Sequence, residues 1–154
     1  MPRAIVLVVL GLALLGLGWI LWGPKGKAGL DPAEGARFAL GREDAPVVVV
    51  DFSNYLCPHC QNHALNVLPR LKAEYIDTGK VRYLFRDFPF PGQACAACLA
   101  SGRHREEVLA DQKLATDLGL TGTPTFFIAG EKHTGFLPYE EWKRLLDEAL
   151  AKAE

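Results

Sequence analysis

A short apolar segment that leads directly into a pair of cysteines constrains the fold of this chain more than any other feature. Residues Val47–Phe52 follow Pro46 and are rich in β-branched side chains, which predicts a central strand buried on both faces. Cys57-Pro58-His59-Cys60 comes next, and apolar residues three or four positions apart over 65–75 predict a helix that begins at this motif. The two cysteines should therefore stand where a buried strand gives way to a helix.

The rest of the chain predicts a strand–helix alternation of modest size. Pro69 should kink the first helix, and Thr78-Gly79 should end it. A right-handed crossover makes the first two strands parallel, and the last two should form an antiparallel hairpin. These expectations give an α/β fold, ordered β-α-β-α-β-β-α, with a mixed four-stranded sheet. Its later elements are expected over residues 81–85, 106–118, 125–129, 132–136 and 139–151.

The position of Cys57 predicts a reactive thiol. Unpaired N–H groups and the positive end of a helix dipole stabilise a thiolate at a helix N-terminus. Pro58 suits the first helical turn, and His59 should bring a polarisable ring near the sulfur. Such surroundings lower a thiol pKa from about 8.5 to roughly 3.5–7.5. Cys60, one turn further on, should be more buried and act as the resolving thiol. A zinc half-site and a structural disulfide are the alternatives for this pair.

Three segments together resemble the DsbA branch of the thioredoxin superfamily. They are Asp51–Cys60, Arg86-Asp87-Phe88-Pro89 and Gly122-Thr123-Pro124-Thr125-Phe126-Phe127. The likeness covers residues 37–91 and 99–154, and it implies a thioredoxin fold and thiol–disulfide oxidoreductase activity.

The resemblance also implies roles for three residues outside the cysteine motif. Pro124 matches the family's cis-proline, which lies against the active-site sulfurs, and X–Pro bonds are the common place for a cis peptide. Thr123 would tune redox behaviour and substrate release. Asp51, six residues before Cys57, matches a buried acid that assists proton transfer at the resolving thiol. An ordinary acid at a strand end is the alternative for Asp51.

The chain departs from the family in one region. Relatives carry a helical insertion where this chain has only residues 91–103, so most of the insertion is missing and the substrate groove is altered. Cys95 and Cys98 match cysteines found at the two ends of that insertion in some relatives. A structural disulfide is our preferred interpretation of this second pair, and free thiols or a second redox pair are the alternatives.

The N-terminal segment predicts attachment to a membrane. Ala4–Trp22 holds 19 residues without a charge, which at about 1.5 Å per residue approaches the thickness of a hydrocarbon core. We favour an uncleaved anchor over 1–22, with a cleaved signal peptide or a buried helix as alternatives. Residues 23–44, with recurrent Gly and Pro, should form a linker before a thioredoxin-like domain over 45–154. Disulfide chemistry favours a catalytic domain outside the cytoplasm, in the periplasm or at the cell surface, and a secreted one after cleavage.

These features favour an enzyme that exchanges a Cys57–Cys60 disulfide with extracytoplasmic protein thiols, most simply as a disulfide donor. The resemblance implies a membrane redox partner of the DsbB or vitamin K epoxide reductase type. A reductase or an isomerase is the alternative within this chemistry, although an isomerase usually needs a dimer, and we expect a monomer. No cofactor is expected. With a net charge of −1 and no basic cluster, nucleic acid is not an expected partner.

A metal-binding protein that uses all four cysteines is the rival from another class. The gap of 34 residues between the pairs is longer than the roughly 15–20 common in zinc sites of this kind. Among the other polar residues, His63, His104 and His133 should lie at the surface. Arg86-Asp87 should form a salt-bridged strand end.

Overall fold

The computed structural model describes residues 29–90, 102 and 104–153. The chain divides into residues 1–30, of which only the last two are described, and a unit over 31–154. The expected anchor over 4–22 and the pair Cys95 and Cys98 lie outside the described residues. Within the described part of the chain, none of the helices has the length and apolar character that a membrane span requires.

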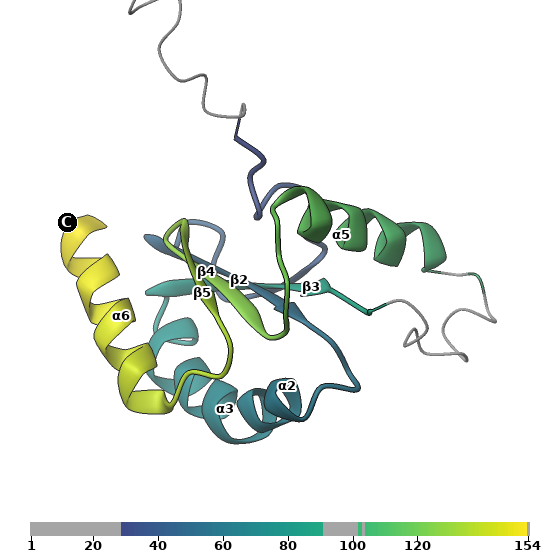
Figure 1. Ribbon diagram of the computed structural model, residues 1–154. Helices are drawn as coiled ribbons and strands as arrows, with labels where there is room; N and C mark the ends of the chain where they lie inside the picture. The colour runs from purple at the N-terminus through teal and green to yellow at the C-terminus, as the bar shows by residue number, and fades with distance from the viewer. Residues whose placement is uncertain (1–28, 91–101, 103, 154) are drawn as a thin grey trace, which may run out of the picture. The chain divides into compact units, whose positions relative to one another are not determined.

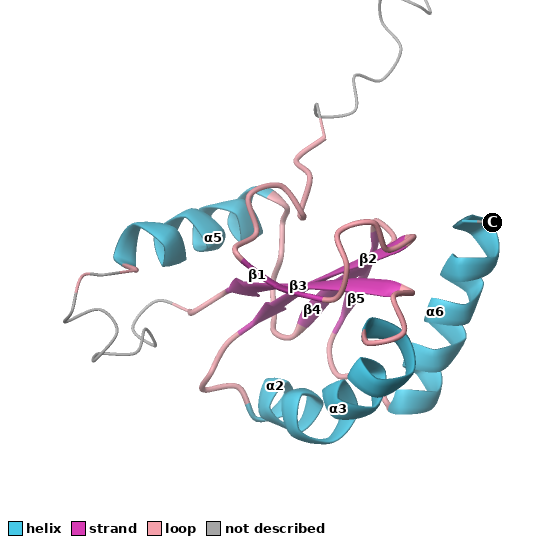
Figure 2. Cartoon of the chain, turned by 180° about the vertical axis from the view of Figure 1, so that it is seen from behind, coloured by secondary structure: helices cyan, strands magenta, loops and turns pink. Residues whose placement is uncertain are grey.

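A five-stranded mixed sheet forms the centre of the larger unit (Figures 1 and 2). The strand order is β1-β3-β2-β4-β5, in which β2 and β3 run parallel and the other neighbours run antiparallel. The strands are β1 (Phe38–Leu40), β2 (Val47–Ser53), β3 (Val81–Asp87), β4 (Thr125–Ile128) and β5 (Glu131–Thr134). The helical segments are α2 (Pro58–Asn62), η1 (His63–Val67), α3 (Leu68–Leu71), η2 (Lys72–Ile76), α5 (Arg105–Asp117) and α6 (Tyr139–Ala153).

Each face of the sheet is covered by helices, as Figure 1 shows, with α5 on one side and α2, α3 and α6 on the other. The larger core lies on the side of α3 and α6, where Trp142 and Phe126 are both fully buried and their rings meet edge to face at 4.7 Å. The smaller core packs α5 against the other face through Ala115, Phe52 and Phe127. The expected thioredoxin-like α/β architecture is confirmed, and β2 is buried on both faces as predicted.

The start of the folded unit differs from the sequence expectation. We expected a linker over 23–44 and four strands, but the compact unit begins at Asp31 and includes β1, which pairs antiparallel with β3. Phe38 and Leu40 of β1 are both exposed. A three-residue edge strand without a buried face leaves no alternation to detect, because its stability comes from backbone pairing with β3.

A buried arginine holds the N-terminal stretch of the larger unit, the residues from Asp31 up to β1. The guanidinium of Arg86 donates to Asp111 of α5 at 2.6 Å and to the backbone carbonyls of Pro32, at 2.7 Å, and Glu34. Asp111 also accepts the backbone N–H of Asp87 at 3.1 Å. The salt bridge expected at Arg86-Asp87 therefore exists, but its acid comes from a distant helix.

The first helix contains two segments with wider hydrogen-bond spacing. The N–H of Leu68 bonds to the carbonyl of His63, and that of Asp77 bonds to the carbonyl of Lys72, which are π-helical i→i−5 pairs. Pro69, where we expected a kink, lacks an N–H and lies between these two segments. The buried face differs from the expected one: Leu65 is 74% exposed although we expected it inside, and His63, four residues before the buried Val67, is 1% exposed although we expected it at the surface.

The second half of the chain follows the prediction closely. The bounds of α5, β4, β5 and α6 differ from those expected by one or two residues, as is usual at element ends. The hairpin between β4 and β5 turns at Ala129 and Gly130, which both have positive φ, as a two-residue turn of type I′ requires.

Candidate active site

The cysteine motif lies at the junction that the sequence predicted. Cys57 is the N-cap of α2 in an extended conformation, and Pro58 is the first helical residue. The N–H of Cys57 bonds to the carbonyl of Asn54 at 3.0 Å, which forms the turn between β2 and the helix. Cys57 is partly exposed and Cys60, one turn further on, is buried, so one sulfur is presented to solvent while the other faces the core.

The loop before β4 lies against the same sulfur. The Thr123–Pro124 bond is cis, as the resemblance implied, and Pro124 is fully buried. The thiol of Cys57 donates to the backbone carbonyl of Thr123 at 3.4 Å. The fold thus brings together two segments that are 66 residues apart in the chain.

The two thiols have opposite acidities. Burial acts to raise the pKa of the Cys57 thiol. Side-chain hydrogen bonds with Thr123 and Cys60, and hydrogen bonds from backbone N–H groups of the first helical turn, outweigh burial and leave this pKa lowered. Burial raises the pKa of the Cys60 thiol to about 11. At neutral pH the accessible sulfur is therefore the better thiolate, and the inner one holds its proton.

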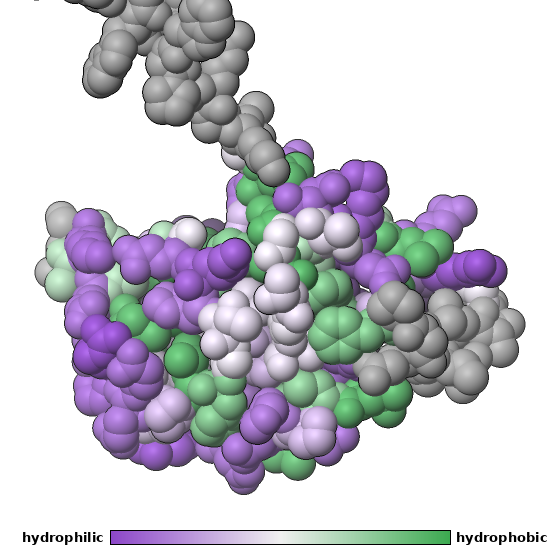
Figure 3. Space-filling model, in the orientation of Figure 1, coloured by the Kyte–Doolittle hydropathy of each residue, from purple (hydrophilic) through white to green (hydrophobic). Residues whose placement is uncertain are grey.

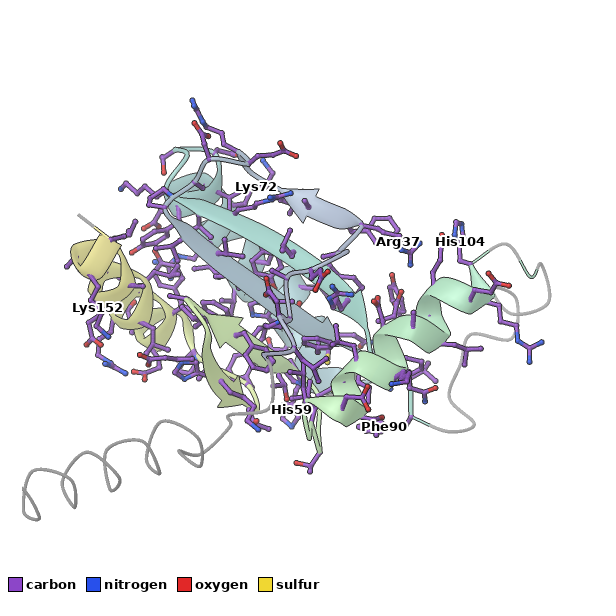
Figure 4. All side chains as sticks on the ribbon, turned by 90° about the horizontal axis from the view of Figure 1, so that it is seen from above. Arg37, His59, Lys72, Phe90, His104 and Lys152 are labelled. Carbon is purple, nitrogen blue, oxygen red and sulfur yellow. The ribbon has the colours of Figure 1, made fainter. Side chains whose placement is uncertain are left out.

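His59 acts on the sulfur through its backbone. The N–H of His59 is one of the groups that lower the Cys57 pKa. Its exposed ring lies 6.5 Å from the ring of Phe136, measured between centroids. In Figure 4 His59 and Lys72, which both belong to the helical run that starts at the motif, lie far apart.

A chain of buried hydrogen bonds lies beneath the cysteines. Asp51 accepts the hydroxyl of Ser53 at 2.5 Å and the hydroxyl of Tyr83 at 2.7 Å. The Tyr83 oxygen also lies 2.9 Å from Nε2 of His63. Burial raises the pKa of the Asp51 carboxyl to about 6, although both hydroxyl bonds act to lower it. Asp51 is thus a buried acid whose pKa lies close to neutral pH.

Three residues of this hydrogen-bonded series, Ser53, Tyr83 and His63, were not identified from the sequence. Ser53 is two residues from Asp51 on the same strand, so the period of two was a usable signal. The meeting of Tyr83 with His63 gave no such signal, because it depends on how the helical run packs against the sheet. The other two histidines were expected at the surface, and His104 is exposed while His133 is half-buried.

Asp51→Asn should change how the free energy of unfolding depends on pH. A carboxyl whose folded pKa is about 6, against 3.8 unfolded, favours folding fully below pH 3.8 and loses that contribution as the pH rises through 6. The free energy of unfolding of Asp51→Asn, relative to that of the original protein, should therefore rise by about 2–3 kcal/mol between pH 4 and pH 7. Urea unfolding of both proteins across this range measures the difference.

His63→Gln provides a companion variant with the opposite sign. Burial lowers the pKa of His63 to about 4 from 6.5, so the neutral ring favours folding above pH 6.5 and loses that contribution as the pH falls through 4. Relative to the original protein, His63→Gln should gain stability as the pH falls. A difference that stays flat with pH for both variants would contradict the buried titrations.

The surface around Cys57 carries several exposed apolar side chains. Tyr55 and Leu56 in the preceding loop are 69% and 62% exposed, and Leu65 on the helix is 74% exposed. In Figure 3 hydrophobic surface is visible where α2 and the loop before it lie in Figure 1. Such exposure next to a reactive sulfur is typical of a surface that meets another polypeptide.

Among the described residues, no group of three or more His, Cys, Asp or Glu side chains is placed to hold an ion. The four-cysteine alternative also requires Cys95 and Cys98, which lie outside that part of the chain.

Comparisons with known proteins agree with this geometry. The family model described as Thioredoxin matches residues 33–97 and 91–148. The "Probable disulfide bond formation protein D" of Bacillus cereus is 38% identical over 106 residues, which cover 61% of this chain and 49% of that protein. The disulfide bond formation protein D of Bacillus subtilis is 40% identical over 63 residues, covering 40% of this chain and 28% of that protein. The chain thus spans at most about half the length of these relatives.

Solved structures show the same fold. Oxidised BdbD from Bacillus subtilis superposes with a TM-score of 0.65 at 19% identity, covering 73% of this chain and 92% of that chain. The structure of α-DsbA1 from Wolbachia pipientis gives a TM-score of 0.63 at 22% identity, and covers 75% of this chain and 91% of that one.

Proposed function

This chain belongs to the thioredoxin family, and from that premise we propose that it is a thiol–disulfide oxidoreductase with Cys57 and Cys60 as its redox pair. One observation carries the proposal: an accessible thiol of lowered pKa lies one helical turn from a buried thiol whose pKa is raised to about 11. An exchange reaction needs this asymmetry, since one sulfur must meet the substrate and the other must close the disulfide.

The proposed direction is disulfide donation. A substrate thiolate attacks the sulfur of Cys57, the Cys57–Cys60 bond breaks, and Cys60 leaves as a thiolate that takes up a proton. A second substrate thiolate attacks its own partner sulfur in the mixed disulfide, and Cys57 leaves. The substrate is thereby oxidised by two electrons and the cysteine pair is reduced. A low pKa makes Cys57 a good leaving group, which favours this direction.

The neighbouring loop has a proposed role in the same steps. The carbonyl of Thr123 lies 3.4 Å from the sulfur of Cys57, so Thr123 can hold the thiol next to the cis-proline at 124. We also retain the family's role for Asp51 as the acid that exchanges a proton with Cys60, which its burial and raised pKa support.

Protein thiols are the proposed substrates, outside the cytoplasm. The names of the Bacillus relatives, disulfide bond formation proteins, support this class of reaction. The apolar segment over 4–22 would anchor the domain to a membrane, where a DsbB-like or vitamin K epoxide reductase-like partner would reoxidise it. The shortened region between β3 and α5 supports a substrate surface that is more open than that of relatives with the full insertion.

Comparing the melting temperatures of the two redox states tests the direction. The full chain with Cys95→Ser and Cys98→Ser leaves one cysteine pair to oxidise. Because the folded reduced state stabilises the Cys57 thiolate, the reduced form should melt above the oxidised form, by about 4 °C for each kcal/mol of stabilisation. If the oxidised form melts higher, donation is wrong, and a reductase becomes the better account.

A further inference from the structure

The resolving cysteine is enclosed away from solvent. Cys60 and Ser53 are each 6% exposed, and Asp51 is 3% exposed. A proton that leaves Cys60 therefore has little direct contact with bulk water. Ser53 lies close enough to the Cys60 sulfur to act on its pKa, and the Ser53 hydroxyl donates to Asp51 at 2.5 Å.

The two carboxylate oxygens of Asp51 accept hydrogen bonds from different hydroxyl groups. Tyr83 donates to Oδ2 at 2.7 Å, while Ser53 binds Oδ1. Since the Tyr83 proton points to Asp51, Nε2 of His63 donates to the Tyr83 oxygen, and Nδ1 of His63 finds no hydrogen-bond partner among the described residues. The side of Asp51 that can take a proton from Cys60 is thus the side that faces Ser53.

The polar groups that face this cluster come from several segments of the described chain. Asp51 and Ser53 come from β2, Tyr83 from β3, Thr123 from the loop before β4, and Cys57, Cys60 and His63 from the helical run and its N-cap. From β4 and α6 the uncharged rings of Phe126 and Trp142 pack against His63, with ring centroids 4.7 and 5.3 Å from that of His63.

We propose that the Ser53 hydroxyl relays the proton between Cys60 and Asp51 during disulfide exchange, with Tyr83 and His63 as positioning residues that hold the other oxygen of Asp51. This inference deepens the proposed function and rests on it. It assigns a role to a residue outside the cysteine motif, the cis-proline loop and the buried acid.

The proton count balances in both directions. When Cys60 resolves a mixed disulfide, its proton moves to the Ser53 oxygen as the Ser53 proton moves to Oδ1 of Asp51. The new thiolate then attacks the Cys57 sulfur, and the partner leaves with the bonding electron pair. When the Cys57–Cys60 disulfide is opened instead, Asp51 returns its proton through Ser53 to the departing Cys60 sulfur. Ser53 gains and loses one proton in each case.

Reaction with the aromatic disulfide 5,5′-dithiobis(2-nitrobenzoate) separates the two cysteines. In the reduced full chain carrying Cys95→Ser and Cys98→Ser, Cys57 attacks first and releases one coloured thiolate. Cys60 then resolves the mixed disulfide and releases a second. Ser53→Ala should leave the first phase within about twofold and slow the second by roughly 10- to 100-fold at neutral pH. Ser53→Thr, which keeps the hydroxyl, should restore the second phase.

The outcomes separate this inference from the proposed function. A second phase that is unchanged in Ser53→Ala overturns the relay and leaves the redox pair intact. Equal slowing of both phases also overturns it, because the effect would then be a general disturbance of the site. Release of a single thiolate by the protein with its original Ser53 would instead overturn the redox pair itself.

A titration still tests the relay if the redox pair is overturned. In a chain that also carries Cys57→Ala, the ultraviolet absorbance of the thiolate reports Cys60 alone. The Ser53 hydrogen bond lowers the pKa of Cys60, so Ser53→Ala should move the Cys60 titration to higher pH and Ser53→Thr should not. An unchanged titration in Ser53→Ala would overturn the contact on which the relay depends.

Discussion

Changing Cys57 to Ser should abolish disulfide exchange, with the rate falling below about one thousandth of the original value. A serine oxygen cannot form a disulfide, and a hydroxyl at this helix start is a far weaker acid than the thiol. Oxidation of a reduced, cysteine-containing model peptide by the oxidised full chain measures the loss. Cys60→Ser should differ in kind, because Cys57 can still attack a disulfide and the mixed disulfide should then accumulate, visible as added mass.

The matched control replaces the second cysteine pair. Cys95→Ser with Cys98→Ser makes the same chemical change twice and should leave exchange at Cys57 within about threefold of the original rate, since substitutions outside a reacting pair usually have small effects. Exchange that survives Cys57→Ser but disappears in this control would move the redox site to the second pair and contradict the proposed function.

Arg86→Met should lower the free energy of unfolding by about 3–5 kcal/mol. Arg86 is 4% exposed and pairs with Asp111 at 2.6 Å, so its removal leaves a buried carboxylate without its cation. It also removes two hydrogen bonds to the backbone of residues 32 and 34. Urea unfolding at neutral pH measures the loss, which is a large part of the roughly 5–15 kcal/mol that stabilises an ordinary domain.

A double variant distinguishes the buried charge from the lost packing. Arg86→Met with Asp111→Leu leaves no charge from this pair inside and should recover a substantial share of the stability lost in Arg86→Met alone. The Asp87 N–H, which Asp111 accepts at 3.1 Å, and the carbonyls of residues 32 and 34 lose their partners, so recovery should be incomplete. A loss below about 1 kcal/mol in Arg86→Met would mean that water replaces the guanidinium and that the N-terminal stretch is held by other contacts.

Local sequence accounts for the elements and for the reactive sulfur. The β-branched run of β2 specifies a buried strand, because such side chains fit a sheet that is covered on both faces. Pro58 directly after Cys57 specifies a helix start at the thiol, since proline needs no acceptor in the first turn. Both follow from short-range sterics and hydrogen bonding, which act between residues a few positions apart.

Tertiary structure decided which groups meet around Cys60. His63 lies on the buried face of the helical run, three residues after Cys60 and four before Val67, and packing against the sheet brings it to Tyr83 of another strand. The pairing of Asp111 with Arg86 and the addition of β1 to β3 also join segments far apart in the chain. Periodicity carries no information about such contacts, because they depend on how the elements pack.

By itself, therefore, the sequence determined where a strand, a helix and an exposed thiol come together, since backbone sterics and the helix terminus act locally. Only the tertiary structure decided that Asp51, Ser53, Tyr83 and His63 form one buried hydrogen-bonded chain beneath Cys60. The physical reason is that burial raises the cost of every unpaired polar atom, and the packed sheet and helix supply the partners within reach.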